Sequence, residues 1–190
     1  GDVITGRQRD FQNAELATLQ QLTDNVTTID NYTDFPTAIS TIGATVTTLI
    51  INKSTTVNSN QTVPSTLTLW FMGQGQLSIS GGVTVTVNGP LSAEPGRQLF
   101  TGAGVVSFTA NALIPRYYID WWGTTAAAFQ ALLDAIPSGA TIHILPKTYS
   151  FSTTRINAAT EFTLEGEGLT SLLSWDVTGL SDPGGNDRGV

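Results

Sequence analysis

The chain has 190 residues, of which 40% are hydrophobic and only 12% charged, and its formal net charge is -7. Disordered chains usually combine few apolar residues with much charge, so this composition excludes a mostly disordered protein. A nucleic-acid-binding protein is expected to carry a basic face, and 8 Lys and Arg against 15 Asp and Glu argue against that class. No apolar run reaches the roughly 20 residues of a membrane-spanning helix, so we expect no membrane insertion.

The chain has no cysteine and a single histidine. These counts exclude disulfides, thiolate zinc sites, cysteine nucleophiles and sites built from several histidines. We therefore expect no metal and no other cofactor. No basic segment followed by a long apolar run opens the sequence, so no secretory signal is expected. Thr, Ser, Asn and Gly dominate the polar positions, which favours an all-β protein with many short strands and tight turns.

Residues 10–30 are predicted to form an amphipathic helix, because apolar residues recur there at spacings of three and four. Two interpretations remain open: the apolar stripe packs on its own domain, or it forms a short oligomeric bundle, for which a trimer is the expected state. Tyr32, Phe35 and Pro36 are expected to end this segment. The apolar positions, and thus the candidate oligomer interface, are Leu16, Leu19, Leu22, Val26 and Ile29.

Residues 44–109 are predicted to be strands, because apolar and polar residues alternate and Gly, Asn and Pro interrupt them every 8–12 residues or so. The clearest alternation is in residues 67–71 and 83–87. Turns rich in Gly and Asn, together with outward Thr, Ser and Gln, favour a solenoid over a sandwich or a barrel. No strict sequence repeat is visible.

A second part follows an aromatic connector at residues 110–123, which we expect to pack between two parts of the chain. Residues 125–136 are predicted to form a helix that Thr124 or Thr125 caps and that Pro137-Ser138-Gly139 stops. Strands are then predicted at residues 141–145, 149–152, 162–164 and 172–175. The expected organisation is an N-terminal helical stalk (1–40), a β-rich solenoid-like segment (41–119) and a capping helix with the first strands of a further solenoid (120–190).

Several segments of the second part resemble the start of a right-handed parallel β-helix of the pectate-lyase-like superfamily, which is found in bacteriophage tailspikes and secreted polysaccharide-active proteins. An upstream region, from Leu49 to Val106, also resembles what often precedes that start. Two departures are that Thr124-Thr125 replaces the usual acidic pair and that Lys147 is followed directly by Thr148, without the usual glycine. The segments that carry the resemblance are Asp120-Trp121-Trp122-Gly123, residues 124–135, Gly139-Ala140-Thr141, Leu145-Pro146-Lys147-Thr148-Tyr149 and Leu164-Glu165-Gly166-Glu167-Gly168.

The resemblance implies a mainly β fold in which the helix at 125–136 caps the first rungs of a right-handed parallel β-helix. It implies a structural virion protein of a phage tail, the N-terminal part of a tailspike or tail fibre, which acts outside the cell. The expected partners are two further copies in a homotrimer, other tail proteins bound through residues 1–40, and host surface polysaccharide bound or degraded by a C-terminal part beyond this sequence. The alternative is a fragment of a secreted bacterial polysaccharide lyase or epimerase, and a third possibility is a free-standing binding or structural module.

Catalytic carboxylates of this family usually lie on later rungs or between subunits, and no position of this sequence matches them. We therefore expect no catalytic residue and no depolymerase activity in this segment, and leave open whether the whole protein is an enzyme. Glu165 and Glu167 are spaced to share one face of a strand, as a glycosidase pair requires. A Gly-Glu-Gly turn is also an ordinary place for exposed acids, and we favour that interpretation.

The remaining candidate residues have structural explanations. His143 alternates with isoleucines, so it is expected to face away from them as a neutral, hydrogen-bonded histidine. Exposed tryptophans can stack on sugars. Trp121 and Trp122, however, lie in the connector that is expected to pack between two parts of the chain, so we expect their rings to pack there. Trp70 is the better sugar-stacking candidate, because its neighbours Leu69 and Phe71 point the other way. Asp182, Asn186 and Asp187 do not fit the spacing of a calcium loop and are expected to be solvated.

Overall fold

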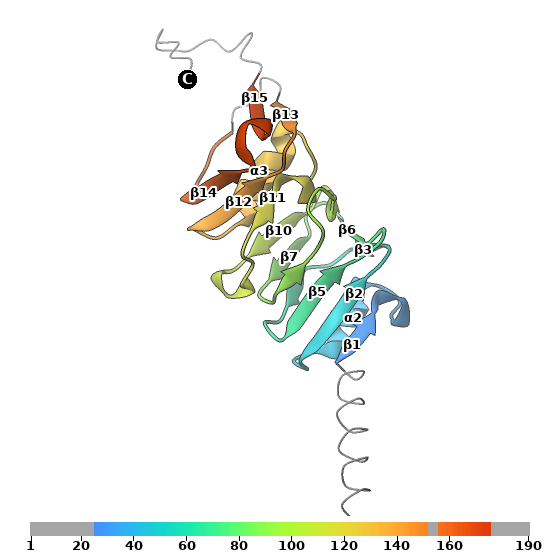
Figure 1. The fold of residues 1–190 in the computed structure, drawn as a ribbon. Helices are drawn as coiled ribbons and strands as arrows, with labels where there is room; N and C mark the ends of the chain where they lie inside the picture. Colours follow the sequence, from blue (N-terminus) through green and yellow to red (C-terminus); the bar gives the residue numbers. More distant parts are fainter. Residues whose placement is uncertain (1–24, 152–155, 176–190) are drawn as a thin grey trace, which may run out of the picture.

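The computed structural model describes residues 25–151 and 156–175 of the chain. These residues are mainly β, as the sequence predicts, and their short strands pair in parallel. Figure 1 shows the elements following one another along the molecule, from β1 at one end to β15 at the other. The strands of the first part are β1 (Val26–Thr28), β2 (Thr47–Ile51), β3 (Ser54–Val57), β4 (Gln61–Val63), β5 (Leu67–Phe71), β6 (Gln76–Ile79), β7 (Thr84–Val87), β8 (Leu91–Ser92), β9 (Phe100–Gly102) and β10 (Val105–Phe108).

Strands β2 to β10 visit three sheets in turn, so that every third strand returns to the same sheet. We call these sheets A, B and C. Sheet A has the order β1-β2-β5-β8, sheet B the order β3-β6-β9 and sheet C the order β4-β7-β10. Each strand pairs in parallel with the one that follows it in its own sheet. The chain thus passes through all three sheets before it adds the next strand to any of them.

The register of these sheets aligns residues 20 to 24 positions apart into continuous apolar rows. Leu49 pairs with Leu69, Leu69 with Leu91, and Val63 with Val87. Because successive side chains of a strand point to opposite faces, such a row lies wholly on one side of its sheet. These rows line the interior, where Leu49, Leu69, Val63 and Val87 are fully buried.

Helix α2 (Phe35–Ile42) packs on β3 and β4 at the first end of the three sheets. Asp34 caps it by accepting a hydrogen bond from the Thr37 amide at 2.8 Å, and Pro36 lies in the first turn, where a missing N–H leaves no helical hydrogen bond unmade. The helix ends at Gly43, whose φ of +59° suits glycine. Pro36 therefore lies at the start of a helix, which was not predicted at these residues from the sequence. The helix buries Phe35, Ala38, Ile39 and Ile42.

The helix predicted at residues 10–30 does not extend into the described part of that range. Val26 belongs to β1, which pairs with β2, and Ile29 begins the 3-10 turn η1 (Ile29–Asn31). Ile29 is fully buried in the chain's own core, so it is not available for an oligomer interface, whereas Val26 is 44% exposed. β-branched residues in this stretch favour a strand that completes the edge of sheet A. Leu16, Leu19 and Leu22 lie outside the described residues.

The predicted segment boundaries fall within elements of secondary structure. The boundary expected between residues 40 and 41 falls inside α2, and residues from 25 on pair or pack with the first sheets. The boundary expected near residue 120 falls in the 3-10 turn η3 (Ile119–Trp121), which directly follows β11 (Tyr117–Tyr118). The short turn η2 (Ala110–Ala112) connects β10 to this region. The connector is thus built from two 3-10 turns and one short strand.

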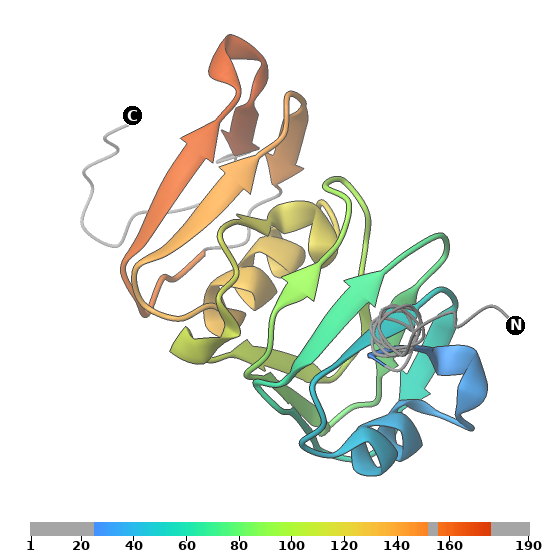
Figure 2. The same ribbon diagram turned by 60° about the horizontal axis from the view of Figure 1, so that its bottom comes forward.

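Helix α3 (Ala126–Ala135) packs against β10 and η3. Thr125 caps it by accepting a hydrogen bond from the Ala128 amide at 3.2 Å, as the sequence predicts for one of its two candidate caps. On another side its Phe129 ring stacks on Phe151, with ring centroids 5.6 Å apart. Figure 2 shows α3 between the strands of sheets A, B and C and those that follow it.

The strands after α3 also pair in parallel. They form a sheet of order β11-β12-β14, which we call sheet D, and a pair β13-β15. Ala140 pairs with Phe162 and Thr148 with Leu172, so residues 22 and 24 positions apart are again aligned. The strand bounds are β12 (Ala140–Ile144), β13 (Thr148–Phe151), β14 (Phe162–Gly166) and β15 (Leu172–Trp175), with the 3-10 turn η4 (Gly168–Thr170) before β15.

Candidate functional site

The outer face of sheet D brings together most of the chemically distinctive side chains that the sequence singled out. Tyr118 on β11 pairs with His143 on β12, and His143 pairs with Glu165 on β14. These three residues therefore lie side by side across three neighbouring strands. Ile142 and Ile144 point the other way and are buried, which confirms that His143 faces away from the isoleucines.

His143 lies between two carboxylates. Its Nε2 is 3.0 Å from Oε1 of Glu167, and its Nδ1 is 3.8 Å from Oε2 of Glu165, beyond hydrogen-bond distance. The Arg116 Nε donates to the same Glu165 oxygen at 3.2 Å, and the Tyr118 ring meets the imidazole edge-on at 5.6 Å. We call Arg116, Tyr118, His143, Glu165 and Glu167 the sheet D cluster.

The geometry of the sheet D cluster favours a surface ion pair and a surface hydrogen bond over a catalytic carboxylate pair. The side chains of Glu165 and Glu167 are 44% and 49% exposed, and each has a nitrogen of Arg116 or His143 within 3.2 Å. Glycosidases keep one carboxylic acid protonated, usually by burying it, beside a second that is ionised. Neither glutamate has a buried environment of that kind. Both acids are thus exposed, as the sequence favoured, but Glu165 lies on β14 and not in a turn.

A groove of about 240 Å³ adjoins the sheet D cluster. Arg116 and Tyr118 belong to both, so the groove and the cluster form one continuous surface. The other lining residues come from β8, the residue directly after it and the connector: Leu91, Ser92, Ala93, Ile114, Pro115 and Trp121.

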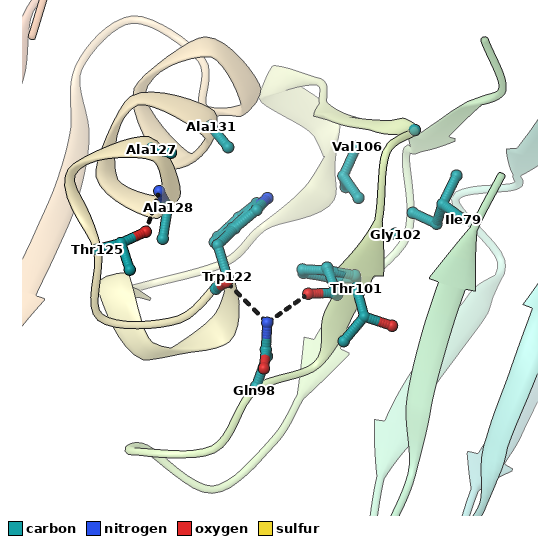
Figure 3. Close-up of a pocket in the computed structure, with 12 residues that line it drawn as sticks. Ile79, Gln98, Thr101, Gly102, Val106, Trp122, Thr125, Ala127, Ala128 and Ala131 are labelled. Atoms are coloured by element: carbon teal, nitrogen blue, oxygen red, sulfur yellow. Dashed lines mark hydrogen bonds between the residues drawn. The ribbon is translucent and has the colours of Figure 1, made fainter. Parts of the chain in front are cut away.

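A second cavity, of about 290 Å³, lies where α3 meets β9 and β10. Figure 3 shows the Trp122 ring between Ala127, Ala128 and Ala131 of α3 and the strands that carry Gly102 and Val106. The Gln98 side-chain amide donates to the backbone oxygens of Trp122 and Phe100 at 2.9 and 3.2 Å (Figure 3). Through these two hydrogen bonds the Gln98 amide group links the connector to β9. The small side chains on both walls leave the space open, and the cavity contains no ionisable side chain.

The tryptophans of the connector pack, as expected. Trp121 is 2% exposed, and its ring lies 6.2 Å from the Tyr117 ring. Trp122 contacts Phe100 and Phe108, with ring centroids 5.0 and 6.0 Å apart. The Trp122 contacts join the connector to β9 and β10, and all these contacts between rings contribute beyond the area that they bury.

Trp70 behaves differently from the connector tryptophans. It is 40% exposed on the outer face of sheet A, whereas Leu69 and Phe71 on either side of it are buried. The predicted orientation of Trp70 is therefore confirmed. Trp175 ends β15, at the last described residue.

A buried polar contact between the connector and β13 was not predicted from the sequence. Asp120 is only 3% exposed; its Oδ1 pairs with the Lys147 ammonium and its Oδ2 accepts a hydrogen bond from the Tyr149 hydroxyl. Burial, and next the hydrogen bond to the Asp120 carboxylate, raise the pKa of the Tyr149 phenol. In the sequence, both segments belong to those that resemble the β-helix start. That resemblance marks the two segments but does not predict which of their side chains meet.

Within residues 25–151 and 156–175, no three His, Asp or Glu side chains are grouped so that they could hold a metal ion. Asp182, Asn186 and Asp187 lie outside the described residues. No helix in the described part of the chain combines the length and the apolar character that crossing a membrane requires.

Comparisons with known proteins give no match: neither a protein-family model, nor a curated protein, nor a solved structure resembles the chain significantly.

Proposed function

We propose that this chain is the N-terminal part of a bacteriophage tailspike or tail fibre, a structural virion protein that attaches to the tail. In this proposal it leads into a right-handed parallel β-helix that binds or degrades host surface polysaccharide. The observation that carries the proposal is the three-sheet repeat of β2 to β10, interrupted by α3 at the residues that resemble the start of such a β-helix.

The arrangement around α3 supports the proposal. The unpaired end of a parallel solenoid exposes backbone N–H and C=O groups and apolar core side chains, which a capping element must cover. Helix α3 packs on β10, and its Phe129 stacks on Phe151 of β13, so apolar groups before and after it are covered. A helix in this position caps one set of rungs and supports the next.

The composition of the outer surface also supports a structural role. Residues 54–93 contain no charged side chain, and the outward positions of sheets B and C carry mainly Thr, Ser and Gln. Hydroxyl and amide groups keep such a surface hydrated without the charges that a catalytic site usually needs. The proposed partners are two further copies of the chain and other tail proteins, the latter contacted through residues 1–40.

The test is immunogold electron microscopy of phage particles from the culture that carries the gene, with antibodies raised against the purified chain. Gold particles on the tails are the expected result. Labelling of soluble protein in the culture supernatant, with no label on particles, contradicts the tail assignment. Antibody from the same animals before immunisation provides the control for non-specific binding to tails.

The alternative, a fragment of a secreted bacterial polysaccharide lyase or epimerase, is favoured by one observation. The sheet D cluster and the adjoining groove place Arg116, Tyr118 and two glutamates on one accessible surface. Labelling confined to the supernatant favours this alternative over the tail protein.

A further inference from the structure

The three sheets of the first part present different outer faces. On sheets B and C the outward positions carry mainly hydroxyl or amide groups, and Val105 is the one large apolar side chain among them that is exposed in the described structure. Sheet A instead carries several large apolar side chains on its outer side or directly beside it. We call these five residues the apolar face: Val26, Val46, Ile50, Trp70 and Met72.

The register of sheet A explains why these residues are neighbours. Ile50 pairs directly with Trp70, and Met72 follows Trp70 by two positions. Val26 pairs with Thr48, so it lies diagonally beside Val46 and Ile50, two positions before and after Thr48. Adjacent strands are about 4.8 Å apart, so Ile50 and Trp70 are in direct reach of each other. Trp70 and Met72 are each 40% exposed, and Val26 and Val46 are 44% and 66% exposed. Exposed apolar residues that lie together, rather than singly, are typical of a surface that another molecule covers.

The apolar face has no charged side chain within it. The sequence has no charged residue between Lys53 and Glu94, and Lys53 itself pairs with Asp30 at 2.6 Å beside the face. Around a threefold axis equivalent residues of the three copies lie close to one another, so charged residues there would bring like charges together. An uncharged face avoids this repulsion in a chain whose net charge is -7. The charge distribution therefore favours a second copy of this chain as the occupant.

The path of the chain connects the apolar face to the predicted oligomer interface. The carbonyl oxygen of Asn25 accepts a hydrogen bond from the Thr48 amide at 2.8 Å, directly before β1 joins sheet A. Residues 1–24 therefore lead into the sheet that carries the apolar face. An oligomer held together by Leu16, Leu19 and Leu22 would bring the copies of this sheet close to one another.

We propose that, in the homotrimer, the apolar faces of the three copies pack against one another around the threefold axis, with Trp70 at the centre of each contact. This inference rests on the homotrimer of the proposed function. Tryptophan suits this position because it buries a large area and is enriched among the residues that dominate binding at interfaces.

The absence of cysteine from the sequence allows a direct crosslinking test in the full chain. Trp70→Cys places a thiol on the central strand β5 of sheet A, and the matched control Thr86→Cys places one on the outward side of the central strand β7 of sheet C. Treatment with a short bismaleimide should link Trp70→Cys chains into dimers at least about tenfold more than Thr86→Cys chains. Met72→Cys provides a second position if Trp70→Cys fails to fold.

A second pair of variants tests the same surface by charge. Trp70→Glu should convert the trimer to a monomer in light scattering, because the carboxylates of the three copies would repel one another at the axis. Thr86→Glu should leave the chain trimeric. Suppose that the unmodified chain is trimeric, that Trp70→Cys and Met72→Cys chains link no better than Thr86→Cys chains, and that Trp70→Glu stays trimeric. The apolar face is then not the interface, although the homotrimer stands. If the unmodified chain is monomeric, both the face and the homotrimer are overturned.

Discussion

The Tyr149 hydroxyl donates a hydrogen bond to the buried carboxylate of Asp120, and so joins β13 to the connector that precedes α3. Lys147 pairs with the other oxygen of the same carboxylate. A buried carboxylate is destabilising unless it is paired and hydrogen-bonded, and here both requirements are met. The contact fixes the strands after α3 relative to those before it.

Removing this contact should destabilise the fold. We expect Tyr149→Phe to lower the free energy of unfolding by about 2 kcal/mol and Asp120→Asn by about 3 kcal/mol, because each leaves a buried polar group without its partner. The double variant should lose less than the sum, with a coupling of about 1 kcal/mol. Urea unfolding followed by circular dichroism measures all three. Glu94→Gln, at an exposed position, is the control, and strict additivity of the two changes would show that the residues act independently.

The turn between β5 and β6 passes close to the end of β2. A Cβ on Gly75 would lie 1.8 Å from the Ile51 carbonyl oxygen, whereas a Cβ on Gly81 would find its nearest neighbour, the Ala103 Cβ, at 3.7 Å. We predict that Gly75→Ala lowers the free energy of unfolding by more than about 2 kcal/mol and that Gly81→Ala changes it by less than about 0.5 kcal/mol. Thermal and urea melts of the two variants compare them directly. Equal stabilities would contradict this close approach of successive turns.

Alkaline pH should destabilise the protein through its buried tyrosines. Burial raises the pKa of Tyr117 from the ordinary 10.0 to about 12. Between these values the unfolded chain has released a proton that the folded chain still holds, so the stabilisation is complete below pH 10 and is lost as the pH rises toward 12. The slope approaches about 1.4 kcal/mol per pH unit for one group. Urea unfolding at pH 9, 10 and 11 should show a smaller decline for Tyr117→Phe, and an identical decline would contradict the assignment.

The chain alone should release neither reducing sugar nor unsaturated uronate from capsular polysaccharides. The sheet D cluster lacks the buried acid that hydrolysis requires, and no position of the sequence matches the catalytic residues that the family resemblance implies. The measurement is a reducing-end assay together with absorbance of unsaturated uronate, over a panel of purified capsules. A known depolymerase serves as the positive control. If the chain does release product, Glu165→Gln and Glu167→Gln would decide whether the cluster is responsible.

The sequence predicted those strands in which apolar and polar residues alternate clearly. Residues 67–71 and 141–145 correspond to β5 and β12, and the helix at 125–136 to α3. Strands β3 and β4 lie in the range predicted to be strands but were not identified one by one, because Ser, Thr and Gln fill most of their positions and only tertiary pairing makes them strands. Local patterns thus identify a strand only where its own residues alternate.

Two further failures have different causes. Pro36 can end one helix or begin another, and only the Asp34 cap and the packing on β3 decide between these. The Asp120–Tyr149 contact joins residues 29 positions apart, and no local pattern predicts which distant side chains meet. For the candidate site, alternation correctly placed His143 and Trp70 on outer faces. The neighbours of His143 in the sheet D cluster, Tyr118 and Glu165, depended on the register of sheet D.

The central claim, a homotrimeric tail protein, is tested most directly by the mass of the unmodified chain in solution. Light scattering after gel filtration, over a range of protein concentrations, gives this mass without reference to shape. The account predicts a single species of three times the 20.1 kDa chain mass. A single species at 20.1 kDa at every concentration would contradict it and would favour the secreted polysaccharide-active protein.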